Sequence, residues 1–164
     1  MIDIRRATPE DAEALVRIHA DASAYYAELE PALFQTPDLT GYAELVERDL
    51  AEADDTTLDL VAAVGDEIVA TLYARLITPQ EGAEYAYPRD VTRTRVEIAY
   101  LATSAQHRRS GAGLALVEAA EAWGREHGAT VAEASTYHRS ALSIPFWTLG
   151  AGYAPRSIVF RKEL

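Results

Sequence analysis

The sequence contains no cysteine, and that absence removes a whole class of chemistry. Without a thiol the chain has no disulfide, no cysteine nucleophile and no sulfur ligand for zinc or an iron–sulfur cluster. It also lacks a run of about 18 apolar residues, the length that a membrane helix needs. The first six residues lack the apolar stretch of a signal peptide. These features together predict a cytoplasmic protein.

Positive charge is scarce as well. The chain carries 15 basic against 26 acidic residues, a formal net charge of -11, which argues against a nucleic-acid or anionic-membrane partner. All of the excess negative charge lies in residues 1–60, which contain 15 acidic residues and 4 arginines. This acidic third is either a solvated surface or a surface that attracts a cationic ligand. Acids and histidines do not gather at metal-ligand spacing, so no metal is expected.

The 164 residues are enough for one domain with a buried core, so residues 1–164 are interpreted as a single domain. Hydrophobic periodicity and turn residues predict the elements. Strands are expected at 2–7, 58–64, 67–73, 96–102, 130–134 and 158–160, and helices at 8–28, 40–53, 114–127 and 143–149. The order βααβββαβαβ predicts an α/β (α+β) fold, a mixed and mostly antiparallel sheet flanked by helices.

The segment between the strand at 96–102 and the next helix is the most informative. It reads Arg108-Arg109-Ser110-Gly111-Ala112-Gly113. Its two glycines let backbone N–H groups approach a ligand closely. A helix start adds unpaired donors and partial positive charge, and the two arginines add formal charge. The segment therefore predicts a phosphate-binding loop.

Other interpretations of this loop fit less well. A Walker loop would need Gly-Lys-Ser/Thr, which is absent. A dinucleotide fold would use Gly111 and Gly113, with Glu133 on the next strand, but Leu116 stands at its third glycine position and only 51 residues follow Gly113. A simple glycine-containing connection with solvated arginines is the structural alternative.

The loop resembles the signature of the GNAT superfamily of acetyl-CoA-dependent N-acetyltransferases, Arg/Gln-x-x-Gly-x-Gly/Ala opening a helix after a strand. The similarity extends to the Phe146-Trp147 and Gly152-Tyr153 segment. It implies a GNAT fold and transfer of an acetyl group from acetyl-CoA to a primary amine of a small molecule or peptide, by direct attack in a ternary complex. A non-catalytic GNAT-fold module that binds acyl-CoA is the alternative. Family members are often homodimers, but nothing in this sequence marks an interface.

The resemblance also implies where the coenzyme binds. Main-chain amides at the signature loop would hold its pyrophosphate, and the pantetheine arm would pair with the end of the preceding strand. That strand is commonly bulged and splays from the next one. An amide near Leu101 would then bond the thioester oxygen and stabilise the developing oxyanion. The residues concerned are Leu101, Ala102, Thr103, Arg108, Arg109, Ser110, Gly111, Ala112, Gly113 and Leu114.

Two residues are expected to transfer protons, one as the general base and one as the general acid. Glu97 lies eleven residues before Arg108, at a spacing where some family members have a general base, and a primary ammonium with a pKa of about 10 needs one. Its alternative is a structural or substrate-binding carboxylate. The family's acid is a tyrosine at the position of Trp147, and because indole cannot supply a proton, Tyr137 is the substitute candidate, with solvent as the alternative.

Simple alternation along this strand puts Glu97 on the same face as Ala99 and Leu101, opposite Ile98 and Tyr100.

The acceptor side in this family comes from the two early helices, their loop and the loop before the central strand. In this sequence those segments hold aromatic and acidic side chains, which suit a cationic and partly apolar amine. The expected substrate-binding residues are Tyr25, Tyr26, Glu30, Phe34 and Tyr85, with Glu28 and Tyr87 nearby. His19, His107 and His127 are expected to be surface or packing residues.

Overall fold

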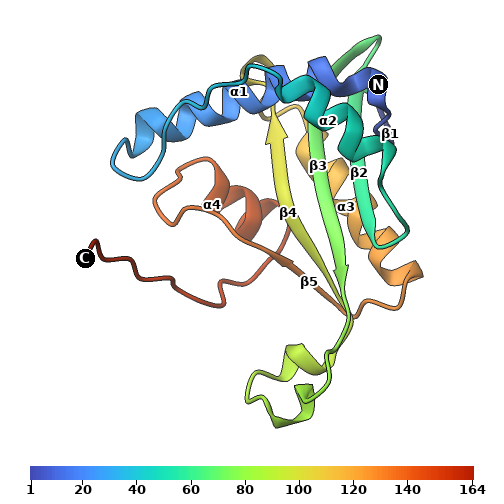
Figure 1. Ribbon diagram of the computed structural model, residues 1–164, viewed down its shortest axis with the longest axis vertical. Coiled ribbons are helices and arrows are strands. Elements are labelled where there is room, and N and C mark those ends of the chain that lie inside the picture. Colours follow the sequence, from blue (N-terminus) through green and yellow to red (C-terminus); the bar gives the residue numbers. More distant parts are fainter.

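The computed structural model describes residues 1–164 as one five-stranded sheet with helices on both faces (Figure 1). The strands lie in chain order across the sheet, and they are β1 (Ile2–Arg6), β2 (Thr57–Val64), β3 (Glu67–Ile77), β4 (Arg95–Thr103) and β5 (Val131–Ala134). Neighbours from β1 to β4 are antiparallel, and β5 is parallel to β4. The predicted mixed, mostly antiparallel sheet is confirmed.

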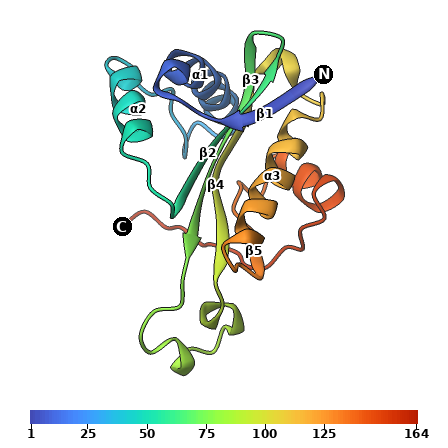
Figure 2. The ribbon, with the colours of Figure 1, turned by 90° about the vertical axis from the view of Figure 1, so that its right-hand side faces the viewer.

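The helices form two layers, one on each face of the sheet (Figure 2). Helices α1 (Ala12–Leu29) and α2 (Tyr42–Ala51) cover one face, and α3 (Ala112–Glu126) covers the other. The short α4 (Ser143–Pro145) continues into a π-helical turn at Phe146–Gly150. The main core lies between the sheet and α3, and its largest buried side chains include Leu72, Val96, Leu116 and Val117. None of the helices combines the length and the apolar character needed to span a membrane.

A buried carboxylate ties β1 to the start of the first helix. Asp11 accepts two hydrogen bonds of 2.7 Å from the Arg5 guanidinium and one of 2.8 Å from the Thr8 backbone N–H. The hydrogen bond from Arg5 lowers the pKa of Asp11. Asp11 is therefore ionised in the fold and satisfies two groups at the helix start.

We expect Asp11→Asn to reduce the free energy of unfolding by about 1–3 kcal/mol, the usual cost of disrupting a buried charged hydrogen bond. Because the pKa of Asp11 is lower in the folded than in the unfolded chain, its contribution is present above about pH 4 and is lost as the pH falls. Urea unfolding of both proteins at pH 7 and in acid measures this. The exposed Asp3→Asn variant is the control, and an equal effect of both substitutions would contradict the assignment.

A bulge in β4 changes which side chains share a face. Consecutive residues of β3 face Tyr100 and Ile98, which leaves Ala99 without a cross-strand partner. Beyond the bulge the alternation is shifted by one residue. Glu97 and Tyr100 therefore lie together on the side of α1, while Ile98 and Leu101 lie on the side of α3. The prediction that grouped Glu97 with Leu101 is wrong, because simple alternation does not anticipate a bulge.

The predicted last strand at 158–160 is also wrong. Residues 151–164 form no helix or strand, and the side chains of Ile158, Val159 and Phe160 are 77%, 91% and 90% exposed. Their strand propensity is real, but a strand needs a neighbour to pair with. The chain leaves the sheet here and the C-terminus lies away from it (Figure 1). The observed order is therefore the predicted one without its final strand.

Candidate functional site

Strands β4 and β5 separate part of the way along their length. They pair from Arg95 and Val131 to Ile98 and Ala134, where β5 ends. Strand β4 continues alone to Thr103, and the two strands diverge from their common end (Figure 1). The result is an open side of β4 next to the segment that follows β5.

Two backbone donors point into this open side. The Ser104 N–H donates to the carbonyl of Val69 on β3 at 2.8 Å. Because the N–H groups of a strand alternate in direction, those of Leu101 and Thr103 point away from β3. No strand pairs with β4 at this level on that side. The edge therefore offers two free N–H groups to an extended ligand.

The loop that leads into α3 adds further donors. The backbone of Arg109 and of Gly111 is left-handed, with φ of 64° and 93°, and the Arg109 value is unusual for a residue with a side chain. Ser110 and Ala112 donate their N–H groups within the loop, but four others have no acceptor in the protein. They belong to Arg109, Gly111, Gly113 and Leu114. Four donors at a helix start suit an anion.

The loop and the edge of β4 form one continuous surface. A Cβ placed on Gly113 would lie 3.5 Å from Thr103 Oγ1 and 3.5 Å from a ring carbon of Phe146. The start of α3 therefore touches both the end of β4 and the turn after α4. The Arg108 guanidinium lies over the ring of Tyr25, 5.2 Å from its centre, which places positive charge beside the loop and fixes the end of α1 to it.

A cluster of tyrosines joins the end of α1 to the segment after β5. The Tyr25 hydroxyl hydrogen-bonds to Ser140 at 3.1 Å and the Tyr26 hydroxyl to Ser143 at 3.0 Å. The Tyr137 hydroxyl donates to Glu30 at 3.1 Å. The Phe34 ring packs edge-on against Tyr137, with ring centres 5.2 Å apart. These contacts span the open side of β4 and bring together four of the five predicted substrate residues, which are Tyr25, Tyr26, Glu30 and Phe34.

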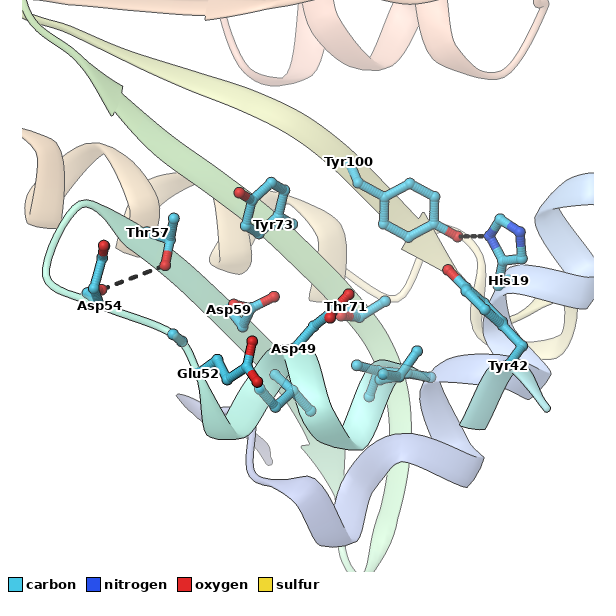
Figure 3. Close-up of a pocket in the computed structure, with 14 residues that line it drawn as sticks. His19, Tyr42, Asp49, Glu52, Asp54, Thr57, Asp59, Thr71, Tyr73 and Tyr100 are labelled. Atoms are coloured by element: carbon cyan, nitrogen blue, oxygen red, sulfur yellow. Dashed lines mark hydrogen bonds between the residues drawn. The ribbon is translucent and has the colours of Figure 1, made fainter. Parts of the chain in front are cut away.

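A cavity of about 590 Å³ lies on the face of the sheet that α1 and α2 cover (Figure 3). Its end near β4 is lined by ring-bearing side chains, those of His19, Tyr42 and Tyr100, with Tyr73 beside them. The rest is lined by the carboxylates of Asp49, Glu52, Asp54 and Asp59 together with apolar side chains of α1 and α2. The cavity therefore combines aromatic surface next to β4 with negative charge at its opposite, more exposed end.

Burial keeps the residues near β4 neutral. It lowers the pKa of His19 and raises the pKa of Tyr100, and His19 Nδ1 and the Tyr100 hydroxyl are hydrogen-bonded at 3.1 Å. Burial also raises the pKa of Asp59, while the charge of Arg6 opposes this shift and that of Asp49 adds to it. Asp59 is half-buried, whereas Asp49, Glu52 and Asp54 are exposed at the mouth of the cavity. This group of carboxylates attracts a cation to the cavity.

A model of the family described as "Acetyltransferase (GNAT) family" matches residues 17–153. The chain belongs to the GNAT acetyltransferase family. The match covers the segments that build the open side of β4, the loop before α3 and nearly all of the cavity lining. No curated protein sequence matches the chain.

Solved structures share the fold at low sequence identity. The tetramutant of the BH1408 protein from Bacillus halodurans is 20% identical with a TM-score of 0.83, covering 99% of each chain. A transcriptional regulator from Bacillus halodurans is 20% identical with a TM-score of 0.73 over 100% of each chain. An aminoglycoside acetyltransferase from an uncultured soil metagenomic sample is 18% identical with a TM-score of 0.68, covering 99% of this chain and 95% of its own. At these identities the likeness concerns the GNAT fold.

Glu97 lies on the cavity side of β4, the side that Tyr100 also occupies. Its side chain is half-buried and forms an ion pair through Oε2 with Arg75 on the neighbouring strand. The other carboxylate oxygen is not used in this pair. Glu97 therefore shares a face of β4 with Tyr100 but is not part of the cavity lining, and one of its oxygens is held by a cation.

The structure does not place Tyr85 near the other four predicted substrate-binding residues. Its side chain is 87% exposed in the loop that extends from the far end of β3 and β4, opposite the end where α1 meets β4 (Figure 1). The long β3, which runs to Ile77, carries this loop beyond the sheet. The expectation that Tyr85 lines the acceptor site with Tyr25 is therefore wrong.

The acidic cavity was not predicted from the sequence. His19 was expected to be a surface or packing residue, yet it lines the cavity and bonds to Tyr100. One signal was available, since Asp59 is a lone charge in the otherwise apolar strand 58–64. A carboxylate in such a strand is unusual unless it faces a polar space. The other acids lie on or after α2, and their convergence depends on tertiary packing.

Proposed function

We propose that this protein transfers the acetyl group of acetyl-CoA to a primary amine on a small cationic molecule or a peptide, with both substrates bound together. Residues 1–164 would act as one acetyltransferase domain, in the cytoplasm, where this donor is made and used. The observation that carries the proposal concerns two sites at β4. Free N–H groups lie along its open edge, and an acidic cavity lies on the sheet face that α1 and α2 cover. A donor and an acceptor could thus meet at one strand.

The anionic donor would lie along the open side of β4. The N–H groups of Arg109, Gly111, Gly113 and Leu114 would hold its pyrophosphate, with the charges of Arg108 and Arg109 nearby. The resemblance also implied Ser110 and Ala112, but their N–H groups donate within the loop. Leu101, Ala102 and Thr103 would pair with the pantetheine arm. The Leu101 N–H would then polarise the thioester carbonyl and stabilise the negative charge that develops on its oxygen.

The acceptor must lose a proton before it attacks. Glu97 would accept that proton through water on its free oxygen, while Arg75 holds the other oxygen. The amine nitrogen then forms a bond to the carbonyl carbon, the carbon–sulfur bond breaks, and the electron pair leaves on the thiolate of coenzyme A. The role of Glu97 is therefore to supply a neutral amine at the position where the thioester is polarised.

For protonation of the thiolate, Tyr137 is our candidate acid. Its hydroxyl lies in the cluster that spans the open side of β4 and donates to Glu30. If Tyr137 delivers the proton, Tyr137→Phe should slow coenzyme A release with little change in the KM for acetyl-CoA. An unchanged rate would assign the proton to solvent, which a thiol with a pKa of about 8.5 permits.

The acidic cavity supports an acceptor with a second positive charge. We expect Asp59→Asn to raise the KM for a linear diamine about tenfold, equivalent to about 1.4 kcal/mol, and to leave the KM for a monoamine of similar length nearly unchanged. Steady-state release of coenzyme A measures both constants. Asp55→Asn is the control, because Asp55 is exposed and lies outside the cavity lining. Equal effects on both amines would contradict recognition of the second charge.

The alternative is a GNAT-fold module that binds acyl-CoA without turnover. The cavity beside β4 favours an enzyme, because a sensor of acyl-CoA needs no second substrate site. Thiol release from acetyl-CoA with a panel of monoamines, diamines and peptides separates the two functions. Binding without release for every amine would favour the sensor.

A further inference from the structure

The sequence contains a single lysine. Fourteen of its 15 basic residues are arginines, and Lys162 alone has a primary amine on its side chain. A guanidinium does not lose its proton in proteins and so cannot attack a thioester, whereas a lysine amine can. The α-amino group at Met1 is the other primary amine of this sequence. An enzyme that acetylates primary amines therefore finds very few acceptors on its own surface.

The C-terminal tail, residues 154–164, crosses from one face of the sheet to the other. Just before the tail, the Tyr153 hydroxyl donates to Glu121 on α3 at 3.1 Å. Three residues later, Arg156 forms an ion pair with Glu133 on β5. Figure 2 shows that the tail emerges on the side of the sheet that α1 and α2 cover. The ion pair of Arg156 therefore directs the tail to the side opposite α3.

The ion pair also lies next to the proposed base. Glu133 pairs in register with Glu97 on β4, so the two carboxylates point to the same face. That face is the one that α1 and α2 cover, since Ala132 and Ala134 pack against the main core from the other face. Neighbouring strands lie about 4.8 Å apart. The tail is thus anchored one strand away from Glu97.

Beyond Arg156, nothing holds the tail to the rest of the chain. Residues 157–164 make no backbone hydrogen bond, and their one side-chain ion pair joins two residues of the tail itself. The exposed Lys162 follows Arg156 by six residues, and six extended residues span at most about 20 Å. The tail extends away from the sheet in Figure 1, but this length allows Lys162 to reach Glu97 when the tail folds back from its anchor.

We propose that Lys162 is a self-acetylation site, reached when the tail folds back over the face of the sheet that carries Glu97. The inference rests on the proposed acetyl transfer and names an acceptor for it within the same copy. Charge favours the approach, because the chain as a whole carries -11 and its acidic cavity lies on this face. The short link to Arg156 keeps the effective concentration of Lys162 high there.

The reaction needs acetyl-CoA as its only co-reactant. Glu97 accepts a proton from the Lys162 ammonium group through water, and the neutral Nζ then attacks the carbonyl carbon of the thioester. The nitrogen–carbon bond forms and the carbon–sulfur bond breaks. The electron pair leaves on the thiolate of coenzyme A, and the nitrogen releases its second proton to water. Acetylation removes the charge of Lys162, so the modified tail is attracted less to the acidic cavity and leaves the site to other amines.

The test is the mass of the purified full chain after incubation with acetyl-CoA and no added amine. The native chain should gain one acetyl group, and fragmentation should place it on Lys162. Lys162→Arg keeps the positive charge but lacks an amine that can lose its proton. This variant should lose the modification completely and still acetylate an added linear diamine at the native rate.

The same preparation separates this inference from the proposed function. If the diamine is acetylated while Lys162 stays unmodified, self-acetylation is wrong and the proposed function stands. If neither amine is acetylated, the proposed function fails and self-acetylation fails with it. Gly111→Glu should leave Lys162 unmodified, because this variant is expected to lose acetyl-CoA binding. Equal modification of Lys162 in this variant would show purely chemical acetylation and would overturn the proposal.

Dilution and the anchor test transfer within one copy. The rate constant for modification of Lys162 should not change with protein concentration, and a rate constant that rises in proportion to it would contradict intramolecular transfer. Arg156→Gln should slow the modification by about tenfold, because the tail loses its anchor, with unchanged turnover of the diamine. Arg161→Gln is the matched control, since it removes the same charge from the tail and keeps the anchor. Equal slowing in both variants would contradict the role of Arg156.

Discussion

Replacing Gly111 with glutamate should weaken acetyl-CoA binding by at least about 100-fold, equivalent to about 2.7 kcal/mol. Gly111 has a φ of 93° immediately before α3 and its N–H has no acceptor in the protein. A side chain there would strain the backbone, and a carboxylate would repel the pyrophosphate that the loop is proposed to bind. Isothermal titration with acetyl-CoA measures the loss.

The matched control is Gly128→Glu. Gly128 follows the other end of the same helix with a φ of 80°, and no atom lies within 4 Å of a Cβ placed there. This variant imposes a similar backbone cost on α3 but leaves the loop at its start unchanged. It should lose stability and keep its affinity for acetyl-CoA. Equal affinity in the Gly111→Glu and native proteins would contradict the loop assignment.

Glu97→Gln should lower kcat by about 10²–10⁴-fold on a good amine substrate, the usual contribution of a general base. Glutamine keeps the shape and a hydrogen bond to Arg75 but cannot accept the proton of the ammonium group. The rate should also lose its native dependence on pH and follow the fraction of free neutral amine. Steady-state rates between pH 6 and 10 measure both effects.

His19→Gln separates the base from its neighbours. His19 shares the cavity side of β4 with Glu97, and burial lowers its pKa, so its neutral imidazole is the other group able to accept a proton there. If Glu97 is the base, His19→Gln should change KM more than kcat and keep the native pH profile. A pH profile lost in His19→Gln but kept in Glu97→Gln would assign the base to His19.

The features predicted correctly from the sequence are those fixed by local patterns. The loop from Arg108 to Gly113 is recognised from its glycines and its place between a strand and a helix, and the structure gives it that position between β4 and α3. The first strands and the long helices follow from their periodicity. The grouping of Tyr25, Tyr26, Glu30 and Phe34 came from the family resemblance, which places the end of the first helix on the acceptor side.

The features that were missed depend on contacts distant in sequence. The resemblance implied a bulge in this strand but not its position, which the pairing of β4 with β3 sets at Ala99 and which moves Tyr100 to the face of Glu97. The acidic cavity forms because α2 lies over β2 and β3, which brings Asp49 close to Asp59. It also gives part of the excess acid in the first third of the chain a specific location, next to the proposed acceptor. The strand predicted at 158–160 does not form because these residues pair with no strand of the sheet.

The central claim is that acetyl-CoA binds along the open side of β4 and at the start of α3. The most direct measurement is a titration with acetyl-CoA followed through backbone amide NMR signals. The free N–H groups of Leu101, Thr103, Gly111 and Gly113 should show the largest shifts, and those of the loop around Tyr85 should not move. Shifts confined to other parts of the chain, with these four signals unchanged, would contradict the account.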